Sequence, residues 1–224
     1  MIEYSLTRSS RKTLALQIKN GVLKVRAPLK MPKREIEKFI TSKEQWVLDA
    51  LAKSEERVQK REKFQRDYGD SILYLGNEYP IIAKEGNRIS FNDAFYVPCG
   101  LTPEQIKSAC IQIYRMLAKR DITNRVIEFA KLMSVNPTSV KITGAKTRWG
   151  SCSSKGSLNF SWRLIMADSD VVDYVVVHEL AHLREMNHSK KFWDVVAETL
   201  PDYKERKKRL KELGSILANE SWED

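Results

Sequence analysis

The segment that decides the organisation of this 224-residue chain is Val175-Val-Val-His178-Glu179-Leu-Ala-His182-Leu-Arg-Glu-Met-Asn-His188. It contains the pattern H-E-x-x-H, and a third histidine follows six residues later. On an α-helix, His178 and His182 lie about one turn apart, so both imidazoles can reach one metal ion from the same face. Glu179 projects beside them, where its carboxylate can accept a proton from a water that the metal activates. The segment therefore predicts a metal-dependent hydrolase.

A catalytic zinc site normally has three protein ligands and one open position. We expect His188 to be the third ligand, because its spacing suits the site and the chain has no histidines outside this segment. A continuous helix would carry His188 to the far side, so the helix must end before it. Asn187 suits that end, since asparagine tolerates the left-handed conformation, and Ser189 would begin the next helix. The competing third ligand is Glu198, while Glu185 is expected to orient a ligand or face solvent. In the remaining alternative the motif binds no metal.

The parts of the motif predict a reaction. Zinc lowers the pKa of a water, Glu179 accepts the proton and passes it to the leaving amine, and a polarised carbonyl is attacked. A second electrophile should stabilise the oxyanion. The candidates are Arg148, in the basic segment Lys146-Thr-Arg-Trp, and Tyr203, just after the ligand helices. A purely structural role explains either residue equally well.

Composition limits the class of protein. No apolar run approaches the roughly 20 residues that a membrane-spanning helix needs, and the N-terminal residues lack the apolar core of a signal peptide. The cysteines are odd in number and widely spaced, at Cys99, Cys110 and Cys152. That spacing suits a reducing compartment without a disulfide framework. We therefore expect a cytoplasmic protein that does not bind membranes.

Positive charge is concentrated at the N-terminus. The net charge is +10, and residues 1–34 contain nine Lys or Arg against one acid, Glu3. Such an excess can attract nucleic acid or a nucleotide. The other interpretation is a solvated basic face, because only Tyr4 lies among these charges in a position to stack on a base.

Strand and helix signals predict an α+β fold with two modules. Residues 1–100 form a β-rich basic module with one long helix, which begins at Lys33 and continues through the charged residues 53–65. Residues 101–224 form the second domain, with a short three-stranded sheet and the H-E-x-x-H helix. The linker is expected at 98–102, because Thr102 can cap a helix that has Pro103 in its first turn.

Three segments together resemble one family of proteins. They are Arg148-Trp-Gly-Ser-Cys-Ser-Ser-Lys-Gly156, Tyr174-Val-Val-Val-His-Glu-Leu-Ala-His182 and Asn187-His-Ser-Lys-Lys-Phe-Trp193. They look like the YgjP-like metallopeptidases, which are related to SprT-like and minigluzincin-type zinc peptidases. The resemblance implies a zincin-like catalytic domain over residues 101–224, zinc on His178, His182 and His188, and Glu179 as the base. Cys152 could ligate zinc in a latent form, but a small buried residue beside Gly150 is the simpler interpretation.

Three functions are compatible with these features. The first is an intracellular zinc peptidase that acts on peptides or proteins. The second keeps the metal but hydrolyses nucleoside triphosphates, with the basic residues 1–34, Lys146 and Arg148 binding phosphate. The third is a nucleic-acid-associated protein with a structural metal site. An open fourth position and the basic Glu179 favour catalysis, and the H-E-x-x-H geometry favours peptide bonds.

Overall fold

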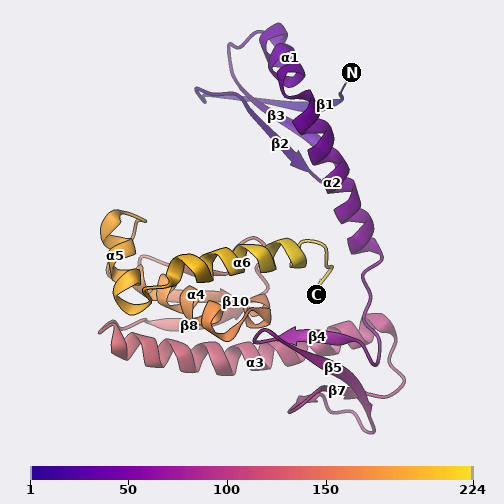
Figure 1. Cartoon of the computed structure of the whole chain (residues 1–224), viewed down its shortest axis with the longest axis vertical. Coiled ribbons are helices and arrows are strands. Elements are labelled where there is room, and N and C mark those ends of the chain that lie inside the picture. The colour runs from indigo at the N-terminus through magenta and orange to yellow at the C-terminus, as the bar shows by residue number, and fades with distance from the viewer. Residues whose placement is uncertain (1, 223–224) are drawn as a thin grey trace. The chain divides into compact units, whose positions relative to one another are not determined.

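Residues 2–222 are described in the computed structural model, and they form two units (Figure 1). The first unit runs as far as Phe64 and includes Leu217–Ser221. The second begins at Gln65, continues to Ile216 and includes Trp222. No helix within residues 2–222 is long and apolar enough to cross a membrane.

A three-stranded sheet organises the first unit. It consists of β1 (Tyr4–Ser9), β2 (Ala15–Lys19) and β3 (Val22–Pro28), with β3 in the centre. β1 pairs with β3 in parallel, and β2 pairs with it in an antiparallel hairpin. Asn20 and Gly21 form the hairpin turn with φ values of 51° and 72°. These left-handed conformations are the ones that the Asn-Gly signal predicts.

Two helices cover this sheet. They are α1 (Lys33–Ser42) and α2 (Glu44–Glu62), and they share one hydrophobic cluster with the central strand. Its buried members are Leu23, Val25, Ala27, Ile36, Ile40 and Val47. Beyond Val47, α2 has no fully buried residue, which agrees with the charged extension expected from the sequence.

The long helix that was predicted from Lys33 is divided at Lys43. The two residues before this break have hydroxyl side chains that bond back to the helix: Thr41 Oγ1 donates to the carbonyl of Glu37, and Ser42 Oγ donates to that of Phe39. Hydroxyls bonded in this way compete with the backbone ladder and bend or end helices. The break lets residues of both helices contribute to one cluster.

The second unit starts with a four-stranded sheet. Its strands are β4 (Ser71–Tyr74), β5 (Asn77–Lys84), β6 (Ser90–Phe91) and β7 (Phe95–Pro98), in the order β4-β5-β7-β6. β5 and β7 pair in parallel, whereas the outer pairs are antiparallel. This sheet and that of the first unit account for the β-rich character predicted for residues 1–100.

Helix α3 (Pro103–Leu132) joins this sheet to the rest of the unit. It begins with the predicted cap: Thr102 Oγ1 accepts from the backbone of Gln105, and Gln105 Oε1 accepts from that of Thr102. The hydroxyl of Tyr114 on α3 donates to Leu73 O at 2.6 Å. The boundary expected near residue 100 thus lies inside the second unit; that residues 1–100 act as a separate module stays a prediction.

The HExxH helix lies between a small sheet and two further helices. β8 (Ser139–Thr143), β10 (Ser157–Ser161) and β9 (Gly150–Cys152) form a sheet in that order, with β8 and β10 parallel. The 3-10 helix η1 (Trp162–Met166) then leads to α4 (Ser169–Ala181). The chain continues into α5 (Lys190–Thr199) and α6 (Tyr203–Leu217). The α+β class, with a three-stranded sheet beside the HExxH helix, is confirmed.

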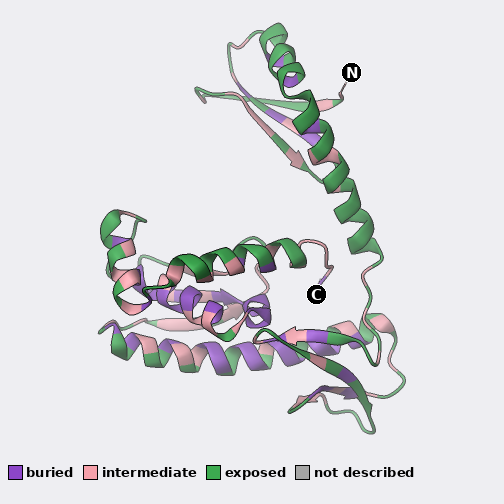
Figure 2. Ribbon diagram, in the orientation of Figure 1, coloured by how far each residue is buried: buried purple, intermediate pink, exposed green. Residues whose placement is uncertain are grey.

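Helix α4 is buried along most of its length (Figure 2). It contacts α3, β9, η1 and α5. Its run of valines lowers helix propensity, so tertiary packing has to stabilise the helix. This burial fixes the axis from which the motif side chains project.

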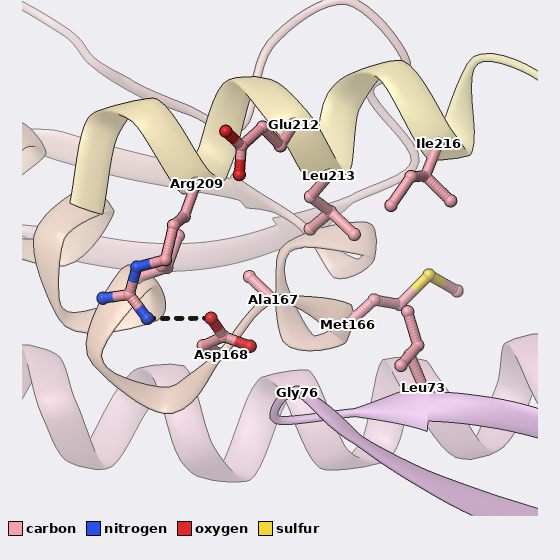
Figure 3. A pocket seen from close by; sticks show the side chains of 10 residues that line it. Leu73, Gly76, Met166, Ala167, Asp168, Arg209, Glu212, Leu213 and Ile216 are labelled. Atoms are coloured by element: carbon pink, nitrogen blue, oxygen red, sulfur yellow. Dashed lines mark hydrogen bonds and ion pairs between the residues drawn. The ribbon is translucent and has the colours of Figure 1, made fainter. Parts of the chain in front are cut away.

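The N-terminal end of α4 is held by an ion pair beside a cavity of about 210 Å³ (Figure 3). Arg209 on α6 donates to Asp168 Oδ2 at 2.9 Å and also pairs with Asp170. Gly76 closes against the same aspartate, because a Cβ there would lie 2.2 Å from Asp168 Oδ1. His178 is ten residues further along, or roughly 15 Å at 1.5 Å per residue. This cavity is therefore separate from the HExxH motif.

Candidate metal centre

The three histidines converge on one point although they come from different local structures. His178 lies on the last full turn of α4, His182 is the residue directly after the helix, and His188 lies in the turn before α5. One ligand atom from each ring lies within 4.8 Å of the other two. The Nε2 atoms of His178 and His188 are 3.1 Å apart.

The helix ends earlier than the sequence predicted. α4 stops at Ala181, and the amides of residues 184 and 185 then form turns to Ala181 O. The prediction that Asn187 ends the helix in a left-handed conformation was wrong, because its φ is not positive. Instead Asn187 Oδ1 accepts from the amide of Ser189 at 3.1 Å. This turn, closed by the Asn187 side chain, leads the chain into α5. It places His188 next to the C-terminal end of α4.

The environment favours the neutral form of His178 and His182. Burial first, and then the neighbouring rings of His182 and His188 and the charge of Lys207, lower the pKa of His178 to about 3. Burial likewise lowers the pKa of His182. His182 Nδ1–H donates to Glu185 O at 3.2 Å, since a carbonyl can only accept. This bond fixes the tautomer and leaves Nε2 with a free lone pair. The carbonyl of Glu185, not its carboxylate, thus orients the His182 ring.

These residues fit a tetrahedral divalent metal. With metal–nitrogen bonds of about 2.05 Å, two ligand nitrogens in a tetrahedral site lie roughly 3.3 Å apart. The 3.1 Å between His178 and His188 is close to this separation. Neutral imidazoles suit zinc and also cobalt, nickel and copper.

Glu179 is buried next to this group, with 5% of its surface exposed. Burial raises the pKa of its carboxyl to about 7. Gly150 of β9 makes room for it, because a Cβ at that position would lie 2.6 Å from both Cγ and Oε1 of Glu179. A carboxyl with a pKa near neutrality is well suited to accept and return a proton.

The other candidate residues from the sequence occupy three kinds of position. Glu198 is on α5 with its side chain 74% exposed, pairs with Arg184 at 3.8 Å and is outside the histidine group. Arg148 is exposed and lines a cavity of about 300 Å³ together with Gly150. Cys152 lies on β9, as Gly150 does. Burial first, and then the charge of Glu179, raise the pKa of the Cys152 thiol. Its S–H donates to the backbone of the next residue at 3.4 Å.

Aromatic rings form the other wall of the site. The ring of Phe192 lies 4.6–4.9 Å from the three imidazoles. Trp193 lies 5.8 Å from His178 and from His188, and Tyr203 stacks on Trp193 at 5.2 Å. Tyr203 thus approaches the site through Trp193.

Lys207 lies beside this aromatic wall and was not among the residues predicted from the sequence. Its ammonium lies over the ring of Trp193, 4.6 Å from the centroid. No spacing rule relates a lysine on one helix to a tryptophan on another.

The chain matches one family model and is similar to two solved structures. A family model described as YgjP-like, metallopeptidase domain, matches residues 12–213. Two solved structures are similar to this chain. One is the metallopeptidase zymogen of Pyrococcus abyssi abylysin, 22% identical over 40% of this chain and 90% of that chain, with a TM-score of 0.37. The other is the metallopeptidase zymogen of Methanocaldococcus jannaschii jannalysin, 21% identical over 41% and 94%, with a TM-score of 0.37. The comparison with curated proteins gave no match.

Proposed function

Because the chain belongs to the YgjP-like metallopeptidase family, and is therefore a metal-dependent hydrolase of the peptidase class, we propose that His178, His182 and His188 hold a zinc ion and that Glu179 is the general base. Family membership is what the sequence predicted. The observation that carries the proposal is the group of three imidazole nitrogens within 4.8 Å, next to a buried carboxyl. Three neutral ligands leave a fourth position open for substrate and water.

The metal would supply two effects when bound: it would lower the pKa of a water and polarise the carbonyl of the scissile bond. Glu179 accepts the proton of the attacking water. It then protonates the nitrogen of the leaving amine, so the base ends the cycle as it began. The raised pKa of about 7 supports both halves of this transfer, because neither protonation state is strongly favoured near neutral pH.

Oxyanion stabilisation is assigned to one of two residues. Arg148 lines the cavity that also contains Gly150, the residue in contact with Glu179. Tyr203 stacks on Trp193, whose ring lies 5.8 Å from that of His188. Arg148 therefore has the better supported position. A guanidinium donates several hydrogen bonds and stays charged at any working pH.

The substrate is a peptide or protein, as the family implies. Binding of nucleic acid or nucleotides by the basic N-terminal residues, and a cytoplasmic location, stay predictions from the sequence. The choice of zinc over another divalent ion is part of the proposal.

The test compares two kinds of bond on one preparation. Purified protein is loaded with zinc and incubated with casein and a fluorogenic peptide library, and in parallel with nucleoside triphosphates. We expect peptide cleavage that chelation removes and zinc restores, and no phosphate release. Glu179→Gln should be inactive with its metal retained, whereas the exposed Glu198→Gln should match the wild type. Phosphate release without proteolysis would replace the proposal with the phosphohydrolase, and proteolysis by Glu179→Gln would reject the assigned base.

A further inference from the structure

A charged aromatic surface lies beside the histidine group, and its lysine has no part in the reaction described above. It consists of Trp193 on α5 with Tyr203 and Lys207 on α6, and we call it the Trp193 shelf. Tyr203 and Lys207 are four residues apart, so they project from the same side of α6. Both contact the indole, Tyr203 by stacking with an interplanar angle of 16° and Lys207 by its ammonium at 4.6 Å.

Within residues 2–222, Lys207 has no carboxylate partner, unlike the two arginines near it on α6. Arg206 pairs with Asp202 at 3.0 Å, and Arg209 pairs with Asp168 at 2.9 Å. Among residues 2–222, no Asp or Glu is recorded within ion-pair distance of Lys207. A cation over an indole face is attracted to the ring but keeps N–H donors free on its outer side. The shelf therefore offers an uncompensated positive charge to solvent.

This charge is within reach of a peptide bound at the histidines. The indole centroid is 5.8 Å from the rings of His178 and His188. Combined with the 4.6 Å from Lys207 to the indole, this places the ammonium no more than about 10 Å from either imidazole. An extended peptide advances about 3.3 Å per residue. A carboxylate one or two residues from the scissile bond can thus contact Lys207.

We propose that Lys207 is a specificity-determining residue, which binds a substrate carboxylate within two residues of the scissile bond while Trp193 and Tyr203 support the adjoining side chains. The carboxylate can come from an Asp or Glu side chain or from the C-terminus of the peptide. This inference rests on the proposed peptidase function. It adds a preference for acidic substrates that the metal and Glu179 do not create.

The experiment uses a peptide that the wild type cleaves in the assay above. It is synthesised with Glu or Gln at each of the two positions on either side of the cut bond, and with a free or amidated C-terminus. We expect kcat/KM to be about tenfold higher for one carboxylate-bearing form, because a hydrogen bond between charged groups stabilises by about 1.5 kcal/mol or more. The difference should shrink at high salt. The Glu/Gln pairs identify a side-chain source, and the free/amidated pair identifies the terminus.

Three variants test whether Lys207 is responsible. Lys207→Met should remove the preference while leaving kcat/KM for the Gln or amidated form within about twofold, and Lys207→Arg should restore it. Lys208→Met is the matched control, because this neighbouring exposed lysine projects about 100° away around the helix. Equal rates on acidic and neutral forms in the wild type, or a preference that survives Lys207→Met, would overturn the inference.

Binding separates this inference from the proposed function. In the Glu179→Gln background, tryptophan fluorescence is titrated with the acidic and neutral forms of the peptide. Tighter binding of the acidic form, lost in Glu179→Gln with Lys207→Met, supports Lys207 independently of turnover. If the wild type cleaves no peptide, the proposed function fails. If it cleaves both forms alike and binds them alike, only the role of Lys207 fails.

Discussion

The burial of Glu179 predicts that removing its charge stabilises the metal-free protein, although the same change abolishes activity. Its carboxyl has an ordinary pKa of 4.5 and a pKa of about 7 in the fold. Between these values the unfolded chain has released a proton that the native state still holds. The native state therefore loses stability as pH rises from about 4.5 to about 7, and the loss is complete above that range. Glutamine is nearly isosteric and has no proton to release, so Glu179→Gln avoids the loss.

The magnitude follows from the size of the shift. One pKa unit corresponds to 1.36 kcal/mol, so a shift of about 2.5 units amounts to about 3 kcal/mol. Glu179→Gln should match the wild type near pH 4.5 and exceed it by as much as about 3 kcal/mol at pH 8. His178 and His182, whose pKa values are lowered, are present in both proteins, so their contribution largely cancels in the difference. For a domain of this size, that corresponds to a rise in Tm of about 6–12 °C.

The assay is denaturant unfolding in the presence of a chelator, at half-unit intervals from pH 4.5 to 8.5. Tryptophan fluorescence is a suitable probe, because Trp149, Trp162, Trp193 and Trp222 all lie in the second unit. Glu198→Gln controls for loss of an exposed carboxylate. A Glu179→Gln difference that stays flat from pH 5 to 8, or a variant less stable than the wild type at pH 8, would refute the reasoning.

Three further experiments have defined outcomes. His188→Ala should weaken zinc binding by more than about 100-fold in a competition titration, whereas Glu198→Ala should leave the affinity unchanged. If both variants lost affinity equally, the carboxylate of Glu198 would have to be considered as a ligand again. Gly150→Ala should lower kcat about 100-fold at full metal content, because its Cβ would lie 2.6 Å from Glu179 Cγ and displace the carboxylate. An unchanged kcat would show that β9 and α4 can move apart to accept the methyl group. Arg209→Met removes the ion pair at the N-terminal end of α4, away from the histidines. It should lower the free energy of unfolding by about 1 kcal/mol and Tm by about 2–4 °C without changing metal affinity. A loss of metal binding would contradict this prediction.

Local chemistry is what the sequence could predict. The Asn20-Gly21 turn and the Thr102 capping box lie where the residues indicate. The three histidines could be assigned to one site because His178 and His182 are one helical turn apart and His188 follows only six residues later. Such features depend on residues a few positions apart, so periodicity and turn preferences are sufficient to find them.

The features that the sequence did not predict depend on contacts between distant residues or on competing local bonds. The division at Lys43 comes from hydroxyls that bond to carbonyls, which hydrophobic periodicity ignores. The end of α4 at Ala181 was placed six residues too late, because asparagine was assumed to end the helix through its backbone rather than its side chain. Lys207 and Trp193 meet only because two helices pack together.

All three proposed ligands lie within eleven consecutive residues, whereas the residue that accommodates Glu179 lies on a strand 29 positions earlier. Metal binding therefore depends on one short segment of the chain, whereas catalysis also depends on the strand that contains Gly150. A preparation in which the strand segment is nicked or misplaced could still carry a full complement of ion. A measurement of metal content would count such molecules as active enzyme although they do not cleave substrate. An active-site titration with a tight inhibitor is the proper measure of how many molecules in a sample function.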